Sequence, residues 1–225
     1  MAKNNKKNYE VNEFDEALVA SKSFFEKNKN AILYGCGSVL GIIIAALLIH
    51  QFYLVPRSNK AEESLFAAQE YFMNGDFEKA LNGDGQNMGF LAIADEFGCT
   101  KAANLAHLYA GLCLYQTEKY QDAIDQLEDY SSCGDDMVSP SVIGTIGNCY
   151  AELGQNEKAV EMLVKAAKKA DNNTLSPIYL IQAGQIYESL GQADKALDCY
   201  KQIKSKYQQS MQYNEIDKYI ERVTK

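Results

Sequence analysis

The feature that most constrains the fold is an uncharged run of twenty-five residues, 31–55, between flanks rich in Lys, Glu and Asp. Its central part, residues 32–49, reads ILYGCGSVLGIIIAALLI and also lacks proline. About 20 residues of α-helix cross a hydrocarbon layer ~30 Å thick. A helix that is apolar on every face needs a large protein to bury it, and a chain of 225 residues is too small to do so. We therefore predict a membrane-spanning helix over residues 31–56.

The flanks of this segment indicate an anchor that is not cleaved. Tyr34 at one end, and Phe52 and Tyr53 at the other, are placed where aromatic rings favour the headgroup region of a bilayer. A secretory signal peptide would have a shorter apolar core followed by a small-x-small cleavage site. Here thirty residues precede the run, and the polar His50 and Gln51 follow its apolar core.

Basic residues near the two ends predict the orientation of the anchor. Lys22, Lys27 and Lys29 lie shortly before it, whereas Arg57 and Lys60 lie shortly after it. Because cytoplasmic flanks carry more basic residues, this difference of one charge favours a cytoplasmic N-terminus.

Gly37, Gly41 and Ala45 form a stripe of small residues within the predicted membrane helix. Small residues at this spacing let a partner helix approach closely. We therefore predict a contact surface for another membrane helix at these three positions. The alternative is that they only reflect how common small residues are in membrane helices.

Residues 1–30 form a separate segment, predicted to be a short cytoplasmic tail. Val11, Phe14, Leu18 and Phe25 recur at helical spacing among charged residues, which predicts an amphipathic helix. Such a helix can lie on the membrane surface or dock on a partner. The alternative is a short, partly ordered tail.

Three stretches after the anchor are similar to one another: residues 110–127, 146–163 and 183–200. Such internal repetition is typical of repeat architectures. Glycine and alanine recur at equivalent positions with periods of 36 and 37 residues: Gly111, Gly147 and Gly184, then Ala123, Ala159 and Ala196.

Each stretch resembles a tetratricopeptide repeat (TPR), a helix pair with small residues where its two helices cross. A glycine in mid-helix costs about 1 kcal/mol relative to alanine. We expect it here because a side chain would hold the paired helices apart. Tyr150 with Gly154, and Tyr187 with Gly191, supply the aromatic residue and the turn glycine of the repeat. In the first stretch Glu118 replaces the turn glycine.

Two further segments complete the predicted array. Residues 67–81 carry a degenerate repeat, and an insertion over residues 82–98 ends in the short apolar helix FLAIADEF. A terminal helix covers the last apolar surface, as a stack of repeats requires. The resemblance implies an all-α fold, in which the N-terminal transmembrane helix precedes a right-handed superhelix of about four helix pairs plus a C-terminal capping helix. The repeat domain is predicted over residues 57–225, with units at about 61–98, 101–133, 138–171 and 174–208 and the cap at 211–223.

No arrangement of residues in the sequence predicts catalysis. His50 and His107 have no Ser, Cys or acidic partner at a recognisable spacing, and there is no phosphate loop or dinucleotide fingerprint. The loop that starts at Asn82 holds Asn87 and Ile93 where a calcium loop needs Gly and Glu. We expect a protein that is not an enzyme and has no cofactor, no metal and no small-molecule substrate.

Charge and cysteine spacing exclude further classes of function. Residues 57–225 hold sixteen basic against twenty-five acidic side chains, so we expect no nucleic-acid partner. The six cysteines form no C-x-x-C pair, which argues against a zinc site or a disulfide framework. We expect the cysteines outside the membrane segment to be small buried hydrophobic residues: Cys99, Cys113, Cys133, Cys149 and Cys199.

The resemblance to TPRs also implies a ligand groove, because the first helix of each pair lines the concave wall of the stack. One end of this wall is apolar and aromatic, which suits an extended or helical protein segment with large apolar anchors. Asn148 matches the class of repeats that grips a terminal carboxylate with Lys and Asn, but no Lys or Arg accompanies it. The alternative is that the insertion at 82–98 covers this end. The candidate groove residues are Leu105, Leu108, Leu112, Tyr115, Asn148, Ile178, Ile181 and Gln185.

Residues 23–29 read SFFEKNK and lie directly before the Gly-rich membrane helix. This tail resembles the YfgM-type ancillary subunit of the bacterial Sec translocon, and the order of tail, anchor and repeats is similar to that of anchored TPR proteins of Bacteroidota-type envelopes. The resemblance implies a single-pass inner-membrane protein with a periplasmic repeat domain. It further implies a scaffold or chaperone-like subunit for protein translocation, with the translocon or a periplasmic chaperone as its partner. The alternative is an organellar import receptor, or another scaffold for assembly of an envelope complex, with its repeats facing the cytosol.

Overall fold

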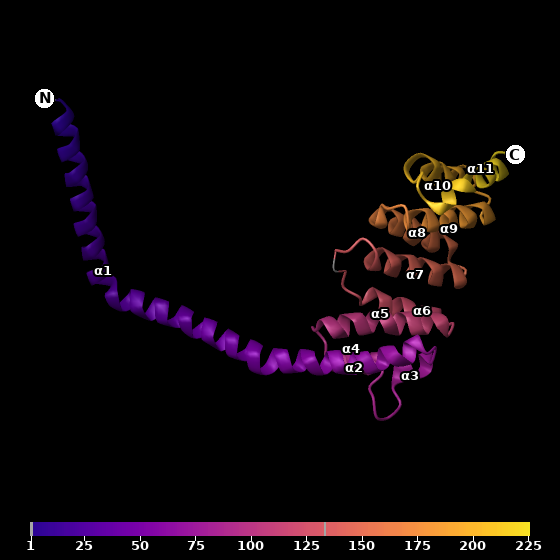
Figure 1. Ribbon diagram of the computed structural model, residues 1–225, viewed down its shortest axis with the longest axis horizontal. Coiled ribbons are helices and arrows are strands. Elements are labelled where there is room, and N and C mark those ends of the chain that lie inside the picture. The colour runs from indigo at the N-terminus through magenta and orange to yellow at the C-terminus, as the bar shows by residue number, and fades with distance from the viewer. Residues whose placement is uncertain (1, 133) are drawn as a thin grey trace. The chain divides into compact units, whose positions relative to one another are not determined.

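The computed structural model describes the backbone of residues 2–132 and 134–225 (Figure 1). Side chains are described from Leu18 onward, except at residues 25 and 133. Helices make up about 80% of the chain, and the described residues contain no strand. The chain forms two compact units, Met1–Pro56 and Arg57–Lys225.

The first unit consists of α1, Ala2–Ile49, and the π-helix η1, His50–Leu54. Side chains along the uncharged segment are exposed, and only Ile32 and Val55 are half-buried. One helix of the described chain, which contains this segment, is long and apolar enough to cross a membrane by length and composition. Of the predicted N-terminal stripe, Leu18 is exposed, and the other three residues lie outside the described side chains.

The π-helix marks the point where the uncharged segment ends. The backbone N–H of Val55 donates to the carbonyl oxygen of His50, five residues earlier in the chain. Pro56 follows directly, and proline has no N–H and a ring that clashes with the carbonyl four residues before it, here that of Phe52. The wider π turn therefore has a local cause in the sequence.

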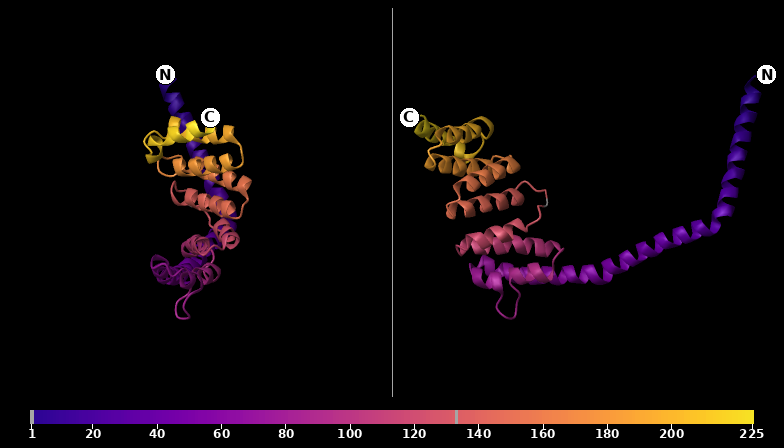
Figure 2. Two further views of the ribbon diagram at one scale, coloured as in Figure 1. Left: turned by 90° about the vertical axis from the view of Figure 1, so that its right-hand side faces the viewer. Right: turned by 180° about the vertical axis from the view of Figure 1, so that it is seen from behind.

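The second unit is a stack of helix pairs arranged in chain order (Figure 1, Figure 2). Successive pairs pack on one another, α6 on α7 and α8 on α9. This confirms the predicted all-α repeat architecture and its capping helix. The helices are α2 (Val55–Met73), α3 (Phe77–Asn82), α4 (Phe90–Glu96), α5 (Lys101–Gln116), α6 (Tyr120–Glu128), α7 (Val138–Glu152), α8 (Asn156–Ala170), α9 (Ser176–Ser189), α10 (Ala193–Lys206), the 3-10 helix η2 (Met211–Asn214) and α11 (Ile216–Thr224).

The recurring mid-helix glycines lie where the two helices of a pair cross, as predicted. A Cβ added to Gly111 would lie 2.5 Å from Cγ of Leu127, and one added to Gly147 would lie 2.9 Å from Cγ of Leu163. A Cβ on Gly184 would meet the ring of Tyr200. Because these distances are shorter than non-bonded carbon atoms allow, only glycine permits the paired helices to approach this closely.

The turns between paired helices share one backbone geometry. Gly75, Gly154 and Gly191 have φ values of 79°, 70° and 69°, and Glu118 adopts 62° at the equivalent position. In each turn the N–H of the following residue donates to a carbonyl five residues earlier, for example from Lys119 to Leu114 at 2.9 Å. This is the left-handed geometry that favours glycine after a helix. Glu118 adopts it without being a glycine.

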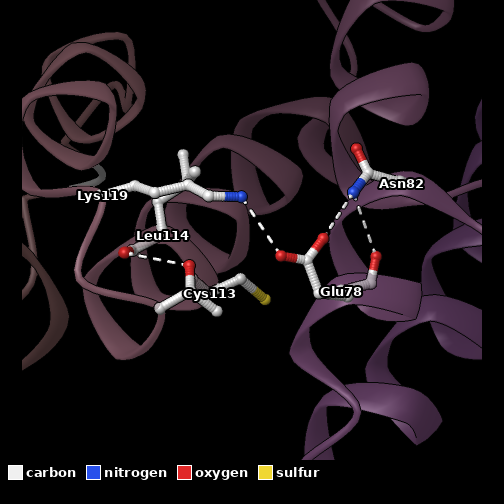
Figure 3. Close-up of polar contacts among 6 residues, drawn as sticks. Glu78, Asn82, Cys113, Leu114 and Lys119 are labelled. Atoms are coloured by element: carbon white, nitrogen blue, oxygen red, sulfur yellow. Dashed lines mark hydrogen bonds and ion pairs between the residues drawn. The ribbon is translucent and has the colours of Figure 1, made fainter.

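Contacts between pairs also join the degenerate first repeat to its neighbour. Nζ of Lys119, in the α5–α6 turn, lies 3.1 Å from Oε1 of Glu78 on α3, and Nδ2 of Asn82 donates to the same carboxylate at 3.1 Å (Figure 3). The ring of Phe72 packs edge-on against Phe77, Phe90 and Tyr109 (nearest centroid 5.2 Å). The predicted apolar helix of the insertion, α4, is thus confirmed and contributes to the core.

Three of the five cysteines outside the first unit are buried, as predicted. Burial raises the pKa of the Cys113 and Cys149 thiols to about 12 and that of Cys199 to about 11. The prediction is wrong for Cys99, which is exposed in a turn with φ of 68°. Cys133 lies outside the described residues.

The last helix is fixed to the preceding pair by a charged cluster. Arg222 on α11 donates from Nε and from Nη2 to the carboxylate of Glu188 on α9, each at 2.7 Å, and the Tyr200 hydroxyl donates to the same group. The guanidinium holds the pKa of Glu188 below its ordinary value. Ile216 is buried in the core cluster around α9 and α10, so α11 covers the end of the stack.

Candidate functional site

The predicted groove residues lie on the first helices of three successive pairs, α5, α7 and α9. Three of their side chains are exposed, and five are half-buried. The exposed ones are Leu105, Ile178 and Gln185, and the half-buried ones are Leu108, Leu112, Tyr115, Asn148 and Ile181.

Part of this set contributes to packing. Leu108 and Tyr115 pack against the core cluster of the earlier pairs, whereas Ile181 packs against the cluster around α9 and α10. The ring of Tyr115 also contacts that of Tyr120 (centroids 5.8 Å apart). The structure therefore divides the set between two clusters, and its role in ligand binding stays a prediction.

The insertion lies beside the apolar end of this wall. Phe90 on α4 stacks on Tyr109 on α5, with ring centroids 5.1 Å apart. Tyr109 is about one helical turn from Leu105 and from Leu112, so it neighbours both on the surface of α5. Leu105 nevertheless keeps 36% of its surface exposed.

The small residues predicted to contact a partner helix are all exposed on α1. Gly37, Gly41 and Ala45 each expose a large part of their surface. A Cβ added to Gly37 or Gly41 would meet no atom within 4 Å. The stripe is therefore open to another helix.

A hollow of about 770 Å³ lies between α8 and the turn that joins α9 to α10. We call it the lysine groove, because four lysines line it. Its apolar part comes from two valines of α8 and from the end of α9. The lining residues are Glu157, Val160, Glu161, Val164, Lys165, Lys168, Lys169, Tyr187, Leu190, Gln192 and Lys195.

The amines of the lysine groove have no acidic partner within the described chain. Lys165, Lys168, Lys169 and Lys195 form no ion pair with any described residue. Nζ of Lys195 lies 5.4 Å from the ring centroid of Tyr187, which is a cation–π contact. The groove is thus locally basic on a chain with a net charge of −8.

Gln192, which lines the lysine groove, has a buried polar atom without a partner. Its Oε1 accepts no hydrogen bond from a described residue. An unsatisfied buried carbonyl costs about 1–3 kcal/mol. Because this oxygen has almost no exposed surface, it belongs to the packing of the α9–α10 turn and is out of reach of a ligand in the groove.

Two carboxyl groups outside the lysine groove, those of Asp84 and Asp135, have a pKa well below the ordinary value, and both have structural roles. Asp84 accepts from the N–H groups of Gln86 and Asn87 and from the Tyr71 hydroxyl (2.7 Å), and these bonds hold its pKa well below its ordinary value. Asp135 likewise caps the start of α7. No group of three or more His, Cys, Asp or Glu side chains that could hold a metal occurs among the described residues.

Sequence reasoning located the first-helix wall but missed the lysine groove. Val160 is buried and Val164 packs against the core cluster around α9 and α10, so packing alone explains both valines. The signal that could have indicated a second surface is the set of lysines at the end of α8, Lys165, Lys168 and Lys169.

The family described as tetratricopeptide repeat-like domain matches residues 22–218. A tetratricopeptide repeat protein from Parabacteroides merdae has a similar structure (TM-score 0.59, 16% identity, 74% of this chain). This chain spans 60% of the length of that protein.

Two other solved structures show the same fold. MamA matches with a TM-score of 0.50 at 17% identity, over 70% of this chain and 92% of its own. TPR-like repeats of a Podosopora anserina putative kinesin light chain match at 0.55 and 13% identity, over 74% and 86% of the two chains. Comparison with curated proteins gave no match.

Proposed function

Because the chain belongs to the tetratricopeptide repeat-like domain family, we propose that it is a membrane-anchored scaffold whose repeats bind protein partners beside a bilayer. The observation that carries this proposal is the uncharged segment 31–55, exposed except at Ile32 and Val55, joined to a stack of helix pairs. Exposed side chains such as Leu33 and Ile42 (64% and 69% exposed) are stable in lipid but not in water.

The anchor supports a specific arrangement. We assign residues 1–30 to the cytoplasm, 31–56 to the membrane and 57–225 to the periplasm. The lysines before the anchor and the SFFEKNK tail at 23–29 support this orientation in the inner membrane of a bacterial envelope. The open stripe at Gly37, Gly41 and Ala45 supplies a surface on which a membrane partner can pack.

In this arrangement the protein is an ancillary, chaperone-like subunit at the Sec translocon. Its first-helix wall holds apolar segments of exported proteins or of a periplasmic chaperone. Leu105 and Ile178 are the exposed aliphatic anchors of this wall. Aliphatic anchors on helices suit extended or helical ligands. The role is binding, and none of the described residues forms a pair suited to acid–base or nucleophilic chemistry.

Photocrosslinking from this wall tests the function. A photoreactive amino acid replaces Leu105 or Ile178 in the full chain, and Gln121, exposed on the second helix α6, serves as the matched control. Both wall positions should crosslink to translocon components or exported proteins, and the control should not. Equal crosslinking to these proteins from all three positions, or crosslinking to none of them, would contradict the proposal.

A reporter fused after Lys225 tests the orientation independently. Activity of a reporter that folds only in the periplasm supports the assignment. If only a cytoplasmic reporter is active, the repeats face the cytosol, and the role at the translocon is wrong even if the scaffold role survives.

A further inference from the structure

We propose that the lysine groove binds an acidic, extended peptide segment of a partner protein. This inference goes beyond the scaffold role, because it adds a second surface, built mainly from the second helix α8 and the α9–α10 turn, and states the chemistry of its ligand. It does not depend on the anchor or on the side of the membrane.

The shape and floor of the groove suit a peptide. Its volume of about 770 Å³ is within the range of ligand pockets. Val160, Val164, Tyr187 and Leu190 supply an apolar floor. An aliphatic side chain of the ligand can be buried there, flanked by polar groups at the rim.

The charges select an acidic ligand. Lys165, Lys168 and Lys169 lie on the C-terminal part of α8, where cations also favour the helix macrodipole. That effect explains Lys168 and Lys169 alone, whereas Lys165 lies about a turn earlier. Lys195 reaches the same hollow from α10.

Two acidic residues also line the groove and restrict how the ligand lies. Glu157 and Glu161 occupy the N-terminal half of α8, about two turns and one turn, respectively, before Lys165. They repel carboxylates at that end. The acidic part of the peptide therefore lies toward Lys168 and Lys169, and a neutral or basic part lies toward Glu157.

The occupant is a peptide rather than a surface or polymer of phosphates. The apolar floor of the groove matches the aliphatic side chains of a peptide, whereas an inorganic anion, a lipid headgroup or a nucleic-acid backbone would meet the lysines alone. The overall net charge of −8 also opposes a long polyanion or an anionic bilayer, whereas a short peptide meets only the local charge of the groove.

Comparison with the equivalent positions of the other repeats shows which lysines are specific to this groove. A lysine over the ring of the preceding tyrosine recurs at Lys79 on Tyr71 and at Lys158 on Tyr150, so the contact of Lys195 with Tyr187 is a feature of the repeat. Position 129, equivalent to Lys165 at the 36-residue period, is an aspartate. Lys165 is therefore not a feature of every repeat.

The test is selection from a phage-displayed library of random peptides against the full chain in detergent. Enriched peptides should combine Glu or Asp with an aliphatic residue. As synthetic fluorescent peptides they should bind at least about tenfold more weakly to the K168E/K169E variant. The control K201E/K206E makes the same charge change on α10 outside the groove and should leave affinity nearly unchanged.

A second variant separates binding from folding. Lys165→Gln removes one exposed amine of the groove, so the unfolding temperature should stay nearly the same while peptide affinity falls. The proposal is wrong if enriched peptides are neutral or basic, if both charge variants weaken binding equally, or if Lys165→Gln leaves affinity unchanged. It is also wrong if the wild type self-associates and K168E/K169E abolishes this, because the occupant would then be a second copy. None of these results alters the crosslinking or reporter outcomes above.

Discussion

The second and third helix pairs share a backbone plan but differ in surface and in length. In both, a glycine on the first helix meets a leucine on the second, Gly111 with Leu127 and Gly147 with Leu163. The second helices differ: α6 ends at Glu128 and contains no basic residue, whereas α8 continues to Ala170.

This difference shows which positions packing fixes and which it leaves free. The crossing glycines and the buried cysteines, Cys113 and Cys149, recur because the space between paired helices admits only small side chains. The charges on the outer faces of α6 and α8 are not constrained in this way. The lysines of the longer helix α8 are therefore where a specific function can be encoded.

The largest expected effect comes from filling the helix crossings. Gly111→Ala should destabilise the protein by about 2 kcal/mol, because its added methyl group would lie 2.5 Å from Leu127. Gly147→Ala should cost about 1 kcal/mol, since the gap of 2.9 Å is wider and alanine favours helix. Thermal unfolding of the full chain in detergent, followed by circular dichroism, measures both. Stability equal to wild type in either variant would contradict the crossing geometry.

The turns of the two pairs give an effect of opposite sign. Glu118→Gly should stabilise the protein by about 1 kcal/mol, because a left-handed φ of 62° strains any residue with a Cβ. Gly154→Ala, at the equivalent turn of the next pair, should destabilise by about the same amount. The same unfolding experiment applies. If Glu118→Gly lowers the unfolding temperature, the glutamate side chain has a role that the turn geometry does not explain.

The smallest expected effect is a dependence on alkaline pH. The pKa of the Cys113 and Cys149 thiols is about 12 in the folded protein, above the ordinary value of 9.0. Their contribution to stability is complete well below pH 9 and is lost as the pH rises through 9 towards 12, because the unfolded state releases protons that the folded state retains. Between pH 7 and pH 9, where only the first part of this loss occurs, the unfolding temperature should fall by about 2 °C more in wild type than in C113A/C149A. Parallel curves for the two proteins would show that these thiols are not buried.

The sequence predicted the fold because repeat periodicity is a local signal that packing reinforces. Gly111, Gly147 and Gly184 identified the helix crossings, and Tyr150 with Gly154 identified the turns. The exposure of Cys99 could not be predicted, because it depends on a turn after α4 that belongs to the insertion and has no equivalent in the repeats. The lysine groove was missed because its residues come from α8 and from the α9–α10 turn of the next pair. Only the packing of one pair on another brings them together.

The most direct test of the account uses Cys99 as a reporter of the side of the membrane on which the repeats lie. In a C36S/C133S variant of the full chain, Cys99 is the exposed thiol, because Cys113, Cys149 and Cys199 are buried. Membranes from a bacterial host are washed with alkaline carbonate, and intact spheroplasts are treated with a maleimide that does not cross the inner membrane. We predict that the protein stays in the washed membranes and that Cys99 is labelled before lysis. Release by carbonate, or labelling of Cys99 only after lysis, would contradict a periplasmic scaffold held by the α1 anchor.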